Sequence, residues 1–106
     1  MTMDPISPED REAARLLHDM ATSPRQSVIW PMYHGAWSTN TVDAFKRGAG
    51  ALEARGDTAG AASLNRLGAD VGDAVGIVTD TGGWPPDAGL AMLNAAEALE
   101  GQPPPQ

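Results

Sequence analysis

The sequence predicts an all-α fold, a small four-helix bundle built around a central antiparallel helical hairpin. Two observations predict this class. Apolar residues recur at helical spacing in four segments, and capping residues, prolines or glycines bound each segment. The one strand-like stretch, VIWPMYHGAW at 28–37, is interrupted by Pro31 and Gly35 and has no partner strand elsewhere in the chain.

The length of 106 residues fits a single domain. We expect one helical domain over residues 7–100, between a flexible N-terminus at 1–6 and a disordered proline-rich tail at 101–106. Large apolar side chains are scarce in this alanine- and glycine-rich chain, so the few aromatic residues should contribute a large share of the buried surface. We detect no internal repeat.

The first helix is expected over residues 7–22. Ser7 can cap it, and Pro8 suits a first helical turn. One face is apolar and consists of Ala13, Leu16, Leu17 and Met20. Ser23 and Pro24 end the helix, and residues 24–39 are expected to form a long aromatic-rich connection with at most a short helical turn.

The central hairpin is expected to join a helix at 41–55 to a helix at 58–79. Gly56 ends the first helix and Asp57 can cap the second, so the junction is tight enough to make the two helices antiparallel. The helix at 58–79 carries a narrow apolar stripe of leucines and valines. A last helix is expected over 86–100, with prolines in its first turn and Gly101 after its end.

Three glycines, Gly68, Gly72 and Gly76, flank the stripe of the 58–79 helix at intervals of four residues. An interior glycine costs a helix about 1 kcal/mol relative to alanine, so three on one side indicate a close approach of another backbone. The row can be an internal packing groove or the seam of a homodimer. We favour internal packing, because the helix at 41–55 also has a side of small residues.

Composition narrows the classes of partner. The net charge is −7 and the seven basic residues form no cluster, which argues against nucleic acid. There is no apolar stretch long enough to span a membrane and no secretory leader, and cysteine is absent, so we expect a cytoplasmic protein without a membrane partner. The histidines lack metal-binding spacing, so we expect neither metal nor other cofactor. The abundance of arginine over lysine hints at a bacterium or phage.

The segment WPMYHGAW at 30–37 contains the candidate binding residues Trp30, Met32, Tyr33, His34 and Trp37. Tryptophan and tyrosine are typical of binding hot spots, so these side chains can form a docking surface. They can instead complete a core that is short of large residues, which is the interpretation we favour. A third possibility is that they divide between core and surface. They can also line a pocket for a small molecule.

The sequence does not name a specific function. We expect a non-enzymatic, regulatory protein-interaction module that binds a protein partner, with a second copy of this chain among the candidates. The alternative is a small-molecule-binding or accessory subunit with an aromatic-lined pocket. An enzyme is less favoured, because its acid–base set would be His34 with Asp43 or Asp80, and no spacing forces these residues together.

Overall fold

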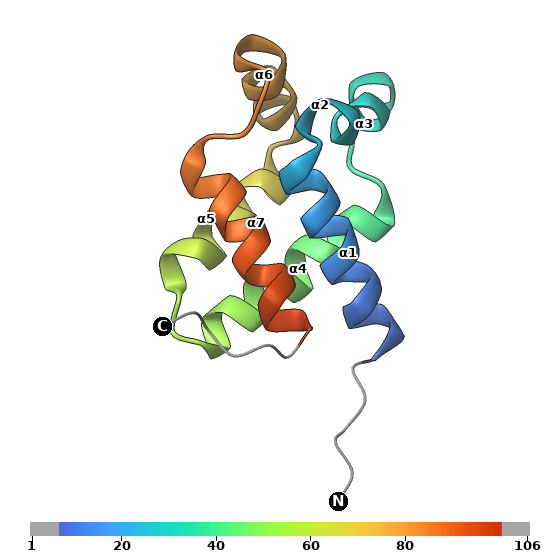
Figure 1. Cartoon of the computed structure of the whole chain (residues 1–106). Coiled ribbons are helices and arrows are strands. Elements are labelled where there is room, and N and C mark those ends of the chain that lie inside the picture. The colour runs from blue at the N-terminus through green and yellow to red at the C-terminus, as the bar shows by residue number, and fades with distance from the viewer. Residues whose placement is uncertain (1–6, 101–106) are drawn as a thin grey trace, which may run out of the picture.

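The computed structural model describes residues 7–100, which form seven helices and no strand (Figure 1). In chain order they are α1 (Pro8–Thr22), α2 (Pro24–Ser27), α3 (Ile29–His34), α4 (Thr39–Ala54), α5 (Thr58–Ala69), α6 (Val71–Thr81) and α7 (Pro86–Leu99). The all-α prediction is confirmed, but the count of four helices is wrong. The predictions for 1–6 and 101–106 lie outside the described residues. The helices described here are all too short or too polar to cross a membrane.

Four helices, α1, α4, α5 and α7, form the body of the molecule. α1 packs on α4 and α7, α5 packs on the same two helices, and α4 contacts α7. The turn between α4 and α5 contains Gly56 in the left-handed conformation, with φ of 84°. The close neighbours across this hairpin are Gly68 with Phe45, Gly48 with Leu64, and Gly60 with Leu52. Along these contacts the residue numbers rise in α4 and fall in α5, so the two helices are antiparallel.

The remaining helices, α2, α3 and α6, lie together at one end of the body, which we call the apex (Figure 1). α6 contacts both α2 and α3 there. The apex corrects two predictions. Residues 24–34 are helical where a connection was expected, and the expected helix at 58–79 is two helices that meet at Asp70.

Asp70 ends α5 and begins α6. Its backbone is non-helical, with φ of −130° and ψ of 85°, and its carboxylate accepts a hydrogen bond from the amide of Asp73 at 3.0 Å. That bond satisfies an amide that a new helix leaves without a partner. The stripe of leucines and valines has the same period on both sides of the break, so periodicity alone predicted one continuous helix.

Pro31 explains why residues 24–34 form two short helices. A proline inside a helix has no amide hydrogen and its ring collides with the carbonyl four residues earlier, which here belongs to Ser27. α2 ends at Ser27, and α3 begins two residues later, at Ile29. The break therefore lies where the proline requires it.

The two halves of the chain repeat one another with a shift of 47 residues. The ends of α1 and α5, the starts of α2 and α6, the ends of α3 and α6, and the starts of α4 and α7 are each separated by this interval. We call residues 7–53 repeat 1 and residues 54–100 repeat 2. Eleven of the 47 paired positions are identical: Asp10/Asp57, Ala14/Ala61, Leu17/Leu64, Val28/Val75, Gly35/Gly82, Trp37/Trp84, Ala44/Ala91, Ala49/Ala96, Ala51/Ala98, Leu52/Leu99 and Glu53/Glu100.

Burial follows the same register. Eight paired positions are buried in both repeats: Ala14/Ala61, Leu17/Leu64, Met20/Leu67, Pro31/Val78, Ala44/Ala91, Phe45/Met92, Gly48/Ala95 and Ala49/Ala96. Exchanging the repeats also converts the α1–α7 contact into the α4–α5 contact and the α1–α4 contact into the α5–α7 contact. The chain is thus a tandem repeat with an approximate two-fold axis. The expectation of no internal repeat is wrong.

The two-fold relation also appears in a pair of hydrogen bonds, one buried and one partly buried. The indole nitrogen of Trp37 donates to the carbonyl of Leu67 at 2.8 Å, and that of Trp84 donates to the carbonyl of Met20 at 2.7 Å. Each carbonyl lies two residues before the end of its helix, where no intrahelical amide is available. Each tryptophan therefore joins its own repeat to the first helix of the other.

Candidate functional site

The aromatic segment divides between core and surface. Trp37 is buried, with 7 % of its surface exposed, and its ring meets Phe45 edge to face at a centroid distance of 5.4 Å. Trp30, Met32 and Tyr33 are instead 47 %, 49 % and 82 % exposed. The predicted set of five residues therefore does not form one site.

α3 anchors the exposed residues through a narrow buried face. Val28, just before the helix, and Pro31 are buried, and their spacing of three residues places them on one side. Two rows of side chains at a spacing of four cover the opposite side: Ile29 with Tyr33, and Trp30 with His34. We call the exposed side chains of Ile29, Trp30, Met32, Tyr33 and His34 the α3 surface.

The α3 surface is ordered by its own contacts. The rings of Trp30 and His34 stack with centroids 3.9 Å apart and an angle of 27° between their planes. The left-handed Gly35, with φ of 73°, ends α3 immediately after His34. Because their rings stack on each other, Trp30 and His34 lose little side-chain freedom when the surface meets another molecule.

Repeat 2 provides a comparison for each position of the α3 surface. The paired positions on α6 are Gly76, Ile77, Thr79, Asp80 and Thr81. α6 forms and packs on the body without a single aromatic residue, so the fold does not need the exposed rings of α3. Trp37, in contrast, recurs as Trp84. Features shared by the repeats are structural, whereas the α3 surface belongs to repeat 1 alone.

Sequence reasoning missed two residues here. Ile29 is half-exposed and extends the α3 surface, and Trp84 repeats the structural role of Trp37. The signal for the second was present as Gly-x-Trp, which occurs at 35–37 and again at 82–84. In both places the glycine has a left-handed backbone and the tryptophan precedes the capping residue of the next helix.

The three glycines of the expected packing groove or dimer seam lie in different surroundings. A Cβ at Gly68 would meet the Phe45 ring at 3.3 Å, a Cβ at Gly72 would meet only the Asp70 carboxylate at 3.7 Å, and a Cβ at Gly76 would meet nothing within 4 Å. The break at Asp70 separates Gly68 from the other two, so the three do not line one surface. The closest helix approach is at Gly48 instead.

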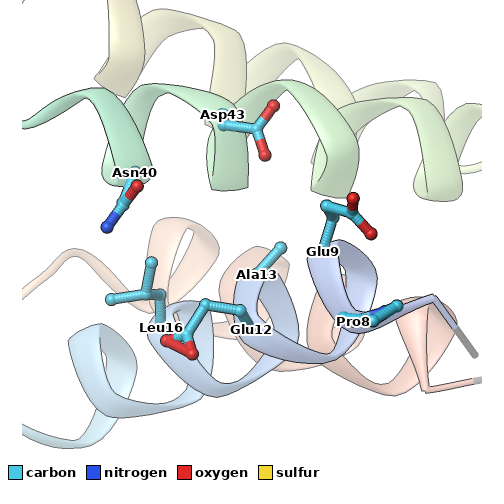
Figure 2. A pocket seen from close by; sticks show the side chains of 7 residues that line it. All are labelled: Pro8, Glu9, Glu12, Ala13, Leu16, Asn40 and Asp43. Atoms are coloured by element: carbon cyan, nitrogen blue, oxygen red, sulfur yellow. The ribbon is translucent and has the colours of Figure 1, made fainter.

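An acidic groove of about 320 Å³ lies between α1 and α4. Figure 2 shows Glu9 and Ala13 extending from α1 toward α4, with Asp43 on the opposite wall. Arg47 donates to Asp43 at 2.6 Å and to Asp10 at 2.9 Å, and these hydrogen bonds raise the pKa of Arg47 above its ordinary value. Within residues 7–100, no three acidic or histidine side chains are grouped as metal ligands. Of the three acids that line the groove, Asp43 is thus paired with Arg47 and Glu12 with Arg15.

The groove recurs in repeat 2, which identifies it as a consequence of the fold. A hollow of about 210 Å³ between α5 and α7 uses the paired positions of five groove residues: Ala59, Gly60, Ser63, Asp87 and Leu90. Two further hollows, of about 390 and 150 Å³, are paired in the same way. The paired hollows therefore share their position in the fold, and they differ in volume and in the side chains that line them.

A fifth hollow, of about 250 Å³, lies in the apex. It is lined by Arg25, Val28, Met32, Val78 and Thr79, and Met32 and Thr79 occupy paired positions. Of the α3 surface only Met32 reaches it, so the exposed rings do not enclose a ligand. Nor do contacts within residues 7–100 join His34 to Asp43 or Asp80, and Asp43 is bound to Arg47.

The α3 surface is thus the candidate site: an ordered, largely apolar projection that the fold itself does not require. No protein-family model, curated protein or solved structure matches this chain.

Proposed function

We propose that this protein is a non-enzymatic interaction module that binds a protein partner through the α3 surface. The observation that supports this most directly is the difference between the repeats. Where α3 has Met32 and Tyr33, α6 has Thr79 and Asp80 in the same structural positions. Exposing large apolar groups to water is unfavourable, and a benefit elsewhere, such as binding, accounts for their presence on a helix that does not need them.

The size of the surface agrees with this role. Taking roughly 150–250 Å² for each fully exposed large side chain, the four exposed apolar residues present about 350–550 Å². Patches of this extent on a monomer are often functional. Trp30 and Tyr33 are also of the residue types that dominate binding energy at protein interfaces.

The test is affinity capture from a lysate of the source organism with a variant that takes its residues from repeat 2. The variant Met32→Thr/Tyr33→Asp gives α3 the residues of α6 and should keep the fold. Leu90→Asp is the matched control, because Leu90 is an exposed apolar residue whose paired position holds Asp43, and it adds the same charge. A partner that binds wild type and the control but not the variant supports the proposal. A partner that binds all three refutes it.

A further inference from the structure

We propose that the partner of the α3 surface is a second copy of this chain, which docks α3 against α3 in a symmetric dimer. This inference rests on the proposed function and names its partner. Self-docking is supported by the distribution of charge along the chain, by the position of Arg25 and by the area available.

The α3 surface lies in the longest acid-free part of an acidic chain. The net charge is −7, yet residues 20–42 contain neither aspartate nor glutamate. The paired stretch at 67–89 contains four, Asp70, Asp73, Asp80 and Asp87. A symmetric contact places identical residues opposite one another, so an acid within it would meet its own like charge. The segment that carries α3 therefore has no acid to repel its own copy, and the acids beside it are those of α6, which packs on α3.

The one arginine or lysine in the acid-free stretch does not create a new obstacle. Arg25 is turned toward α6, where a Cβ at Gly82 would lie 3.2 Å from its guanidinium. Gly82 caps the C-terminal end of α6, where the helix dipole favours a cation. Two copies that meet through Ile29, Trp30 and Tyr33 would thus present apolar side chains and a stacked His34 to each other, with the guanidinium held to the side.

The area sets the strength of the dimer. Two α3 surfaces of about 350–550 Å² each bury less than the roughly 1,200–2,000 Å² of a standard stable interface. We therefore expect an equilibrium between monomer and dimer that depends on concentration. The dimer should not weaken as salt is raised, because salt screens repulsion between two negative molecules and leaves an apolar contact intact.

Sedimentation equilibrium of the purified chain tests the proposal. The average mass should rise from 11.0 kDa toward twice that value between about 10 μM and about 1 mM, the range suited to a small interface. Met32→Thr/Tyr33→Asp should weaken association at least tenfold, while Leu90→Asp should leave it unchanged. A wild type that remains monomeric at about 1 mM, or equal loss in both variants, overturns self-docking.

A second variant tests the geometry by gain of association. Thr79→Met/Asp80→Tyr gives α6, which lies beside α3, the residues of α3, so the apolar surface at the apex grows and association should become tighter. If that variant associates no more tightly than wild type, α3-to-α3 docking is overturned. A wild-type monomer that still captures a different protein through α3 would refute self-docking alone. A monomer that captures nothing would refute the proposed function as well.

Discussion

Gly48→Ala should destabilise the protein, although alanine is the better helix former. Gly48 lies where α4 crosses α7 near the two-fold axis, opposite its paired residue Ala95. A Cβ at this position would be 2.8 Å from Leu17 Cδ1, 3.1 Å from Leu64 Cδ1 and 3.1 Å from Ala95 Cβ. Leu17 and Leu64 are fully buried, so neither can swing into solvent to relieve the contact.

The magnitude follows from two opposing terms. Alanine in place of an interior helical glycine stabilises by about 1 kcal/mol. Overpacking of a well-filled core costs about 1–3 kcal/mol. Gly50→Ala is the matched control, because Gly50 lies in the same helix and a Cβ there would meet nothing within 4 Å. Helix propensity cancels between the two variants, so Gly48→Ala should be less stable than Gly50→Ala by the overpacking cost alone.

Urea unfolding followed by circular dichroism measures the difference directly. Adding Ala95→Gly to Gly48→Ala removes one of the three close contacts, so the two substitutions should be non-additive, with a coupling energy of at least about 0.5 kcal/mol in favour of the pair. The reasoning fails if Gly48→Ala is as stable as Gly50→Ala, because the helices would then have room at their crossing.

Three further predictions concern Trp37, Pro31 and Gly76. Trp37→Phe should lower the free energy of unfolding by about 1–3 kcal/mol, because the buried carbonyl of Leu67 loses its donor, whereas Trp30→Phe should change it by less than about 0.5 kcal/mol; equal effects in urea unfolding would contradict the assigned roles. Pro31→Val, which installs the residue of Val78, should join α2 and α3 into one helix like α6; a new amide at position 31 that exchanges with solvent as fast as an exposed amide would show that the proline is not the cause of the break. Gly76→Ala should raise the melting temperature, since a Cβ there meets open space and alanine gains up to about 1 kcal/mol; a lower melting temperature would indicate packing on α6 that the structure lacks.

Local signals in the sequence were sufficient for the longer helices of the body. α1, α4 and α7 begin and end within two residues of the predicted bounds, because Ser7, Pro86 and similar residues specify helix ends locally. The break at Asp70 was missed because a capping aspartate inside a periodic apolar stripe is easily read as a surface residue. Its paired position, Ser23, was read correctly only because a proline follows it.

The division of the aromatic segment could not be predicted from residue types. Trp30 and Trp37 are chemically identical, and their burial depends on what the fold brings near them. Trp37 is buried because α5 lies beside it. In α5, Gly68 packs against Phe45, and the carbonyl of Leu67 accepts the hydrogen bond of the Trp37 indole. The repeat would have distinguished the two tryptophans, since only Trp37 recurs. It escaped detection because 11 identities in 47 positions, four of them at alanine, leave little contrast with an alanine-rich background.

The two tryptophan hydrogen bonds that join the repeats have a consequence for how the chain folds as it is synthesised. α1 makes its most extensive contact with α7, and the carbonyl of Met20 accepts its hydrogen bond from Trp84. The first helix to be synthesised therefore cannot complete its packing until the last has been made. At roughly 5–20 residues per second, α7 is complete on the order of 4–15 s after α1 has been made. During that interval the side of α1 that packs on α7 is uncovered, and nascent chains on one messenger are close neighbours. A second nascent chain at the same stage presents the same uncovered face, so early termination of synthesis would favour entanglement of fragments over their independent folding.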